Sequence, residues 1–454
     1  MNKLNPLFLF QPLMSSTGTA TPPTPSLSGA DSSATGPHQT VLTIPESPTT
    51  APPTSKQSWR DVVFAQLYKH WFLLGLGLAI GLARAFPTVG KKGGPIRAEW
   101  SIKWGAVCII FFISGLSLRT KVLIREIVRV RLHALVQIIS LVIIPFVVYG
   151  IIELFRAVHV PIDGTLLSGI VIAASTPTTV SSNVVMTKNG GGNEAAALMN
   201  AALGNILGIF VSPALVYLFL HDVASSNSTA TSATFSQYTS GPQLDYISVL
   251  ENLGATVLAP LVVGQVIQTI WPDTIAKWRA KFRLGDINSL CLLLLVWSVF
   301  CDTFASDSFA KIHASDLVAV LVIDAILYVG FSALAWFLAR LPIPFRTRRE
   351  NGWVEKWRFS REDTVAIMYC GATKTVSMGV PLINVLYSGG DPGVIGVLST
   401  PLLMYHVEQL IIGSAEVTVL KRWVEKGKRE DEMAREAEQR SETVEGHEEE
   451  DLIQ

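Results

Sequence analysis

The chain has 454 residues, of which 49% are hydrophobic and only 16% are charged, and its mean hydropathy is +0.40. Soluble domains carry about 25% charged residues, so this composition excludes an ordinary soluble enzyme. The formal net charge is zero, and the Lys and Arg residues lie in short loops between apolar blocks, which excludes a nucleic-acid-binding surface. The expected partner is therefore the lipid bilayer, with no nucleic acid.

The first 58 residues precede any apolar block. They contain 10 of the 24 prolines and many Ser and Thr residues, and they lack the basic start and apolar core of a signal peptide. Such a segment buries too little apolar surface to fold on its own. Residues 1–58 are therefore predicted to be a disordered cytosolic tail.

Apolar blocks follow, each close to the length of about 20 residues that crosses a bilayer as a helix. They predict an all-α integral membrane protein with ten transmembrane helices in a membrane domain at 68–424. The predicted spans are 70–86, 103–118, 132–152, 165–186, 195–220, 249–271, 287–305, 316–339, 362–388 and 394–420. The fourth and ninth blocks are the least apolar, because Pro, Gly, Ser and Thr interrupt them.

Sequence motifs for catalysis are absent. No Walker loop, HExxH or GxSxG motif occurs, and the eight His residues are scattered along the chain. The four cysteines (Cys108, Cys291, Cys301 and Cys370) lie in predicted spans and form no CxxC pair, which is typical of small buried side chains. We therefore expect no enzyme and no cofactor, and the cysteines indicate neither a disulfide framework nor a metal site.

The loop charges predict the orientation. With a cytosolic N-terminus, the inside loops carry 17 Lys and Arg residues and the outside loops carry 7, five of them in the first loop. This bias favours both termini inside. A glycosylation pattern at Asn227 lies in a 28-residue loop, 221–248, that lacks Lys and Arg and is predicted to face outside.

A short repeat links the two least apolar spans. Thr179-Val180-Ser181 recurs as Thr375-Val376-Ser377, 196 residues later. Five spans separate the copies, so the copies run in opposite directions through the membrane. This is typical of a transporter with two inverted five-helix repeats (68–220 and 245–424), in which broken helices 4 and 9 cross near the midplane and bind a solute or ion. The alternative is two kinked helices that pack through Ser and Thr contacts.

Several longer motifs resemble one known family. The matching stretches are His70 to Phe72, Gly93 to Pro95, Phe111 to Leu118, Gly191 to Ala197, Phe300 to Phe304, Asp363 to Ile367 and Pro401 to His406. The chain resembles the bile acid:sodium symporter superfamily from residue 68 to about 424, outside the tails and the 221–248 loop. Within that superfamily it is similar to the branch that contains sodium/bile acid cotransporter 7 and the fungal regulators of calcium homeostasis.

The resemblance implies ten helices, cytoplasmic termini, and a core and a panel domain. For the fungal members it also implies a plasma-membrane protein, with other secretory-pathway membranes as further locations. That protein restrains calcium entry, and its implied partners are a calcium channel or calcium-signalling proteins.

The resemblance also implies where ions bind. In the wider superfamily, sodium lies between the crossovers and is held by oxygen ligands. Ser182 and Asn183 match the Ser-Asn pair of span 4, and Gln137 matches the Gln of span 3. Asn200 lies beside the span 5 positions, which are alanines here. The span 9 carboxylate is missing, and Thr373 and Lys374 take its place. The remaining candidates are the hydroxyls of the repeat: Thr179, Ser181, Thr375 and Ser377.

Lys374 is the sharpest single feature, because an ionisable residue inside a span is costly and usually marks function. One hypothesis places its ammonium where sodium would otherwise bind, which makes the protein independent of sodium. The alternatives are a structural Lys paired with Glu408 or Asp302, or a Lys that reaches the membrane interface.

Four further acidic residues lie at informative positions. Glu194 is first interpreted as a carboxylate that complements a helix N-terminus, and Asp302 as a cap or a site. Glu408 makes a poor metal pair with His406, because positions two apart do not share a helix face. Asp324 has no evident partner.

Two functions remain open. The first is a solute-carrier-like protein that lowers calcium influx and maintains cytosolic calcium homeostasis at the plasma membrane. The alternative is a secondary transporter of an organic anion or another small solute or ion. The tail at 425–454, with 12 acidic and 5 basic residues, either recruits partners or forms a solvated face.

Overall fold

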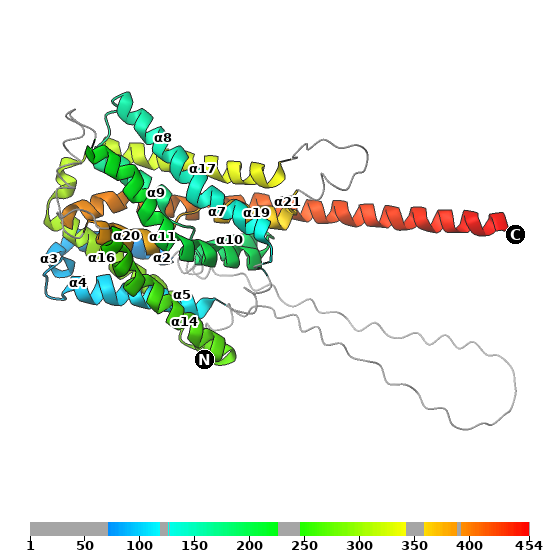
Figure 1. The fold of residues 1–454 in the computed structure, drawn as a ribbon, viewed down its shortest axis with the longest axis horizontal. Coiled ribbons are helices and arrows are strands. Elements are labelled where there is room, and N and C mark those ends of the chain that lie inside the picture. The colour runs from blue at the N-terminus through cyan, green and yellow to red at the C-terminus, as the bar shows by residue number, and fades with distance from the viewer. Residues whose placement is uncertain are drawn as a thin grey trace, which may run out of the picture. The chain divides into compact units, whose positions relative to one another are not determined.

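The computed structural model describes residues 71–118, 126, 128–225, 246–341, 358–387 and 392–453, and those residues form helices and no strand. The principal helices are α2 (Trp71–Ala85), α5 (Val107–Ser117), α7 (Val130–Ile138), α8 (Ile144–Ala157), α9 (Gly164–Ser175), α10 (Ser181–Asn189), α11 (Glu194–Ser225), α14 (Ala259–Ile270), α16 (Leu284–Ala305), α17 (Ala314–Arg340), α19 (Arg361–Ala372), α20 (Val376–Leu386) and α21 (Pro392–Ile453) (Figure 1). Shorter pieces are α3 (Pro87–Gly90), α4 (Ala98–Trp100), α13 (Tyr246–Leu253), α15 (Pro272–Lys281) and η5 (Ser308–Lys311).

Seven continuous helical stretches in this described part are long and apolar enough to cross a membrane. They are Ala98–Ser117, Val130–Ala157, Glu194–Leu220, Val249–Ile270, Leu284–Ala305, Ala314–Arg340 and Gly393–Ala437. Trp71–Ala85 and Gly164–Ser175 are shorter apolar helices. The prediction of a multi-pass, all-helical membrane protein is confirmed at this level.

The predicted fourth and ninth spans are not single helices. Span 165–186 is divided into α9 and α10, and span 362–388 is divided into α19 and α20. The last predicted span, 394–420, is the start of a longer helix, because α21 continues through the acidic tail to Ile453. The predicted tail at 1–58 and the Asn227 pattern lie outside the described residues.

Three stretches adopt the wider π-helical geometry: η2 (Ser101–Ala106), η3 (Ile139–Ile143) and η4 (Gly254–Leu258). A proline is the second residue of the helix after two of them, Pro145 after η3 and Pro260 after η4. Proline has no backbone N–H, so a carbonyl in the preceding turn loses its helical donor. In η3 the carbonyl of Ser140 is released in this way, because residue 145 would be its donor in a π-helix.

Two glycines bring α5 and α14 close together. A Cβ atom on Gly115 would collide with the carbonyl of Leu261, and one on Gly264 would collide with the carbonyl of Phe112. Small residues of this kind allow membrane helices to pack backbone against backbone. Helices α2 and α5 pack against α16, and α14 packs against α5. Helices α9, α17 and α19 pack against α21.

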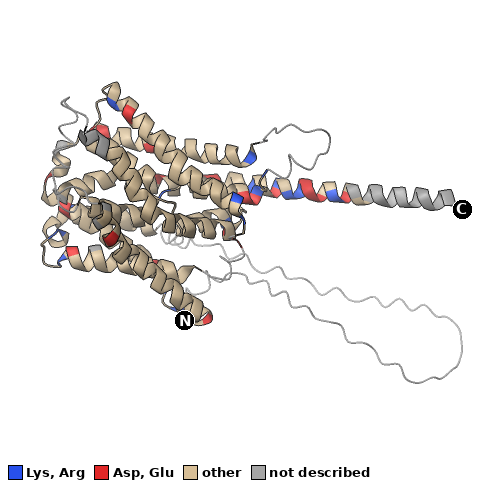
Figure 2. Cartoon of the chain, viewed as in Figure 1, with Lys and Arg blue, Asp and Glu red and all other residues tan. Residues whose placement is uncertain are grey.

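Charged side chains gather at helix ends and along the outer part of α21 (Figure 2). At one such end Arg129 pairs with Asp363, which also accepts a hydrogen bond from Asn193 Nδ2 at 3.0 Å. Arg361 binds Glu430 of α21 at 2.5 Å and donates to the Trp423 carbonyl at 2.8 Å. These contacts join the ends of α7, α11 and α19 to the extension of α21.

Candidate functional site

The first break, residues 176–180, separates α9 from α10. Thr176 is extended, with φ −77° and ψ 153°, as expected for a residue that precedes proline. Pro177 has no N–H to donate and its ring blocks a continuing helix. No side chain caps the N-terminus of α10.

The second break, residues 373–375, separates α19 from α20 without any proline. Thr373 and Thr375 are extended there. The Gln409 side chain accepts from the Lys374 amide at 2.8 Å and donates to the Lys374 carbonyl at 2.9 Å. Tyr405 donates to the carbonyl of Ala372 at 2.7 Å. Side chains of α21 therefore replace the helical hydrogen bonds that this segment lacks.

The two breaks contact each other directly. The Thr375 amide donates to the Pro177 carbonyl at 2.9 Å, and the hydroxyls of Thr178 and Thr373 are 2.8 Å apart. Asn183 connects both sides, because its Nδ2 donates to Thr178 at 2.5 Å and its Oδ1 accepts from Thr373 at 2.8 Å. The buried polar groups of the breaks thus satisfy one another, as a membrane interior requires.

Lys374 is buried beside this contact, with 1% of its surface exposed. Its Nζ donates to the Ser140 carbonyl at 2.6 Å and to the Thr176 carbonyl at 3.0 Å, and lies 3.4 Å from the Ser140 hydroxyl. Neither Glu408 nor Asp302 is among its contacts, so the alternative of a Lys paired with those carboxylates is wrong. Because the ammonium is buried, the alternative of a Lys that reaches the interface is wrong too.

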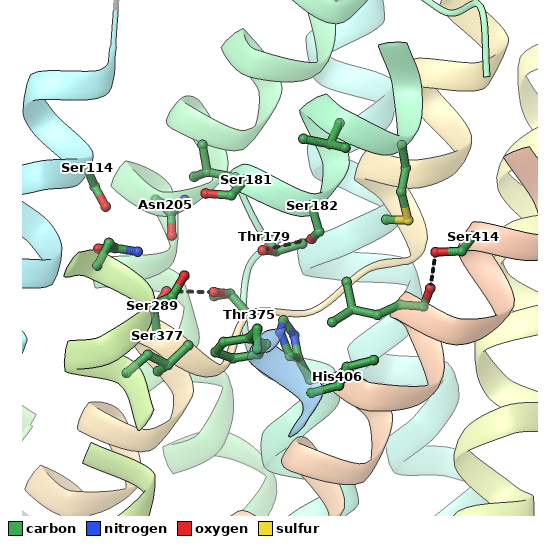
Figure 3. A pocket seen from close by; sticks show the side chains of 18 of the residues that line it. Ser114, Thr179, Ser181, Ser182, Asn205, Ser289, Thr375, Ser377, His406 and Ser414 are labelled. Carbon is green, nitrogen blue, oxygen red and sulfur yellow. Dashed lines mark hydrogen bonds between the residues drawn. The ribbon is translucent and has the colours of Figure 1, made fainter. Parts of the chain in front are cut away.

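A cavity of about 590 Å³ lies against the two breaks (Figure 3). This is within the size range of pockets that hold small organic molecules. The hydroxyls of Thr179 and Ser182 are 3.2 Å apart on one wall, and those of Thr375 and Ser377 are 2.8 Å apart on another, with His406 beside Thr375 (Figure 3). Apolar side chains that include Trp71, Phe72, Phe111, Leu261, Leu292 and Leu410 complete the lining.

The lining of the cavity carries few ionisable side chains. His406 is the one ionisable side chain among the described lining residues, which include no Asp, Glu, Lys or Arg. Apart from His406, the polar lining consists of hydroxyls and of the amides of Asn189, Asn205 and Asn288.

The predicted site residues fall into two groups. Thr179, Ser181, Ser182, Thr375 and Ser377 line the cavity. Asn183, Thr373 and Lys374 lie behind it and hold the breaks together.

Gln137 and Asn200 are paired with one another away from the cavity lining. Gln137 Nε2 donates to the Asn200 carbonyl at 3.0 Å, and the Asn200 side chain lies 3.1 Å from His133 Nδ1. Both residues are buried. Their role as sodium ligands stays a prediction, and in the structure they join α7 to α11.

Two secondary candidates make structural contacts. Glu194 forms an exposed ion pair with Lys188 at 3.2 Å, beside the N-terminus of α11. Asp302 accepts a hydrogen bond from the backbone amide of Lys92 at 2.6 Å, and so helps to hold the connection after α3.

Sequence reasoning missed several residues of the site. Thr178 and Gln409 were not candidates, although both are fully buried and bond the breaks. Ser140 was missed because its role depends on the π-helical turn before Pro145. Only the proline could have drawn attention to that turn.

Comparison with known proteins identifies the family of the chain. The model of the SBF-like CPA transporter family matches residues 70–422. The chain is 33% identical over 381 residues to the solute carrier RCH1 of Candida albicans, an alignment that covers 81% of this chain and 92% of that protein. It is 36% identical over 362 residues to sodium/bile acid cotransporter 7 of Danio rerio, covering 80% of this chain and 96% of that protein.

A mammalian relative gives the same result. Sodium/bile acid cotransporter 7 of Mus musculus is 34% identical over 356 residues, covering 78% of this chain and 94% of that protein. The resemblance stated from the sequence motifs is confirmed by these matches. The chain belongs to the SBF-like CPA transporter family.

Proposed function

We propose that the protein is a secondary transporter of a small amphipathic organic anion, and that the cavity at the two breaks is its solute site. The observation that carries the proposal is the meeting of two uncapped helix N-termini, those of α10 and α20, at a cavity whose described lining residues include no Asp or Glu. Helix N-termini attract negative charge. The apolar wall favours a solute with an apolar body.

The two-halves arrangement is part of this proposal. Residues 68–220 and 245–424 form inverted repeats, and broken helices 4 and 9 are their crossing elements. The hydrogen bonds between Pro177 and Thr375 and between Thr178 and Thr373 support it. The recurrence of Thr-Val-Ser at the start of α10 and at the start of α20 also supports it. The core and panel domains that the resemblance implies belong to the same proposal.

The cavity extends toward one membrane side. Its lining includes Trp71 at the start of α2, Leu118 at the end of α5, Asn189 at the end of α10 and Asn288 near the start of α16. With both termini cytoplasmic, as the loop charges predict, all four helix ends face the cytosol. We propose that the structure is an inward-facing state of a plasma-membrane protein.

Transport is proposed to be independent of sodium. Lys374 Nζ lies among three oxygens, two of them carbonyl oxygens, which are ligands of the kind that a monovalent cation takes. An ammonium that donates to these oxygens makes a bound cation unnecessary for holding the breaks together.

A binding experiment tests the class of solute. We expect a taurine-conjugated bile acid to raise the unfolding temperature of the purified protein, because a bound ligand adds about 2.7 kcal/mol of stability at about 100 times its Kd. An uncharged bile alcohol with the same ring system serves as the neutral comparison. Equal stabilisation by both compounds would exclude anion recognition.

Two variants locate the binding. Ser377→Trp fills the cavity and is expected to abolish the stabilisation. Leu78→Trp adds the same ring on α2 where the side chain is 63% exposed, and is expected to preserve it. Stabilisation that survives Ser377→Trp would place the bile acid elsewhere.

We further propose that the protein lowers calcium influx, as its resemblance to the fungal regulators of calcium homeostasis implies. If this effect follows from solute transport, Ser377→Trp abolishes it in cells that lack the native protein. If the effect depends on recruitment of a channel by the tail, truncation after Val424 abolishes it instead. If both variants still lower calcium influx as the wild type does, neither solute transport nor recruitment by the tail explains the effect.

A further inference from the structure

Two carboxylates lie buried between membrane-spanning helices. Asp324 of α17 is 0% exposed and Glu408 of α21 is 8% exposed. All four of their carboxylate oxygens lack a hydrogen-bond partner within the described part of the chain. Helix α17 packs against α21, and the rings of Tyr328 and Tyr405, which lie about one turn from Asp324 and Glu408 on their helices, are 6.0 Å apart. Two like charges that are neither solvated nor paired are unstable together.

The neighbouring polar groups do not neutralise them. From α17, Tyr328 donates to Glu416 at 3.1 Å, and from α19, Tyr369 donates to the Gly413 carbonyl at 3.0 Å. From α21, Tyr405 donates to a backbone carbonyl. Helix α9, which also packs against α17 and α21, carries no titratable side chain.

The buried cation is engaged elsewhere, because Lys374 Nζ contacts Ser140 and Thr176. A multivalent metal ion also fits poorly. No third His, Cys, Asp or Glu joins the pair to form a metal-binding group in the ranges that the structure describes.

We propose that Asp324 and Glu408 form a proton-binding site, in which a proton taken from solution keeps the two carboxylates from being ionised together. The protonated carboxyl becomes neutral and is able to donate a hydrogen bond. No other bond forms or breaks. The site differs from the cavity, whose lining includes neither residue.

The structure connects this proton site to the second break. Glu408 lies on α21 between Tyr405 and Gln409, and these two neighbours bind the carbonyl of Ala372 and both backbone groups of Lys374. A change of charge at Glu408 therefore acts on the helix segment that holds the break. Ser377, just beyond the break, lines the cavity.

Infrared difference spectroscopy on the full chain in lipid nanodiscs tests the site. Titration of the wild type is expected to show the carbonyl band of a buried protonated carboxylic acid. Asp324→Asn and Glu408→Gln, which preserve shape, are expected to lose or shift this band. Glu153→Gln, at a carboxylate that is 39% exposed and paired with Arg156, is the matched control and retains it.

Two outcomes would overturn the proposal. One is a band that is identical in the wild type and in both variants. The other is a band that sodium ions displace at constant pH, which would make the site a metal-cation site. Two independent conservative variants keep the test informative if one of them fails to fold.

A second measurement tests the connection to the cavity. Alkylation requires the thiolate, so the rate at Ser377→Cys rises with pH in every background. The ratio of the rates with and without Asp324→Asn, followed at that peptide by mass spectrometry, cancels this common dependence and is expected to change several-fold with pH. A ratio that stays constant with pH would overturn the connection. Neither measurement uses a solute, so failure of the anion proposal is distinguishable from failure of this one.

Discussion

At the scale of single residues, Lys374 is the buried cation beside the two breaks, and the proposed independence from sodium rests on it. The sequence predicted a costly buried lysine in place of a carboxylate. The structure adds the oxygens that surround the ammonium, contributed by Ser140 and Thr176. Those contacts were not predictable, because they depend on a π-helical turn and on a break in another helix.

Replacement of the ammonium tests its role. Lys374→Met leaves two buried carbonyls without their donor, and each such loss costs about 1–3 kcal/mol. We expect a lower unfolding temperature that sodium chloride, but not choline chloride, partly restores. The wild type is expected to respond equally to both salts.

A surface lysine provides the control. Lys188, whose side chain is 61% exposed, pairs with Glu194, and exposed pairs contribute little stability. Lys188→Met should therefore unfold like the wild type. A Lys374→Met protein that also unfolds like the wild type would contradict a central role for the ammonium.

At the scale of the elements, the two breaks differ in how far the sequence predicted them. Pro177 explains the first break locally. Nothing within 373–375 forbids a helix, so the low apolar content of the ninth block and the repeat of Thr-Val-Ser were the local signs of the second break. Gln409, whose side chain hydrogen-bonds the backbone of the second break, comes from α21. Such a contact is long-range, and sequence periodicity does not reveal it.

Removal of that contact should be destabilising. Gln409→Leu leaves the amide and carbonyl of Lys374 unpaired, at about 1–3 kcal/mol for each buried group. Gln268→Leu is a matched comparison, because the Gln268 side-chain oxygen is buried without a partner in the described structure. Thermal unfolding should show a clear loss for Gln409→Leu and little change for Gln268→Leu; the reverse order would exclude the proposed role of Gln409.

Close packing of α5 on α14 makes a second prediction at this scale. Gly264→Ala places a methyl group against the Phe112 carbonyl, so the helices must separate. We expect a loss of about 1–3 kcal/mol, observed as a lower unfolding temperature. Gly77→Ala on α2 has open space around its new methyl group and should not lower stability. Equal effects would show that the close approach contributes nothing.

At the scale of the whole molecule, the family and the helical membrane architecture were predicted correctly from composition and motifs. The division of the candidate residues into those that line the cavity and those that bond the breaks was not predicted. Five of them line the cavity, while others bond the breaks to each other. The repeat and the resemblance assigned all of them to one class, because neither distinguishes a hydroxyl that faces a cavity from one that faces a neighbouring helix.

Flux through liposomes tests most directly whether the cavity is a sodium-independent solute path. Uptake of a labelled taurine-conjugated bile acid should be saturable, equal in sodium chloride and choline chloride, and preserved in Leu78→Trp. It should be lost in Ser377→Trp. Uptake that requires a sodium gradient, or that is the same in Ser377→Trp as in the wild type, would contradict this function for the cavity.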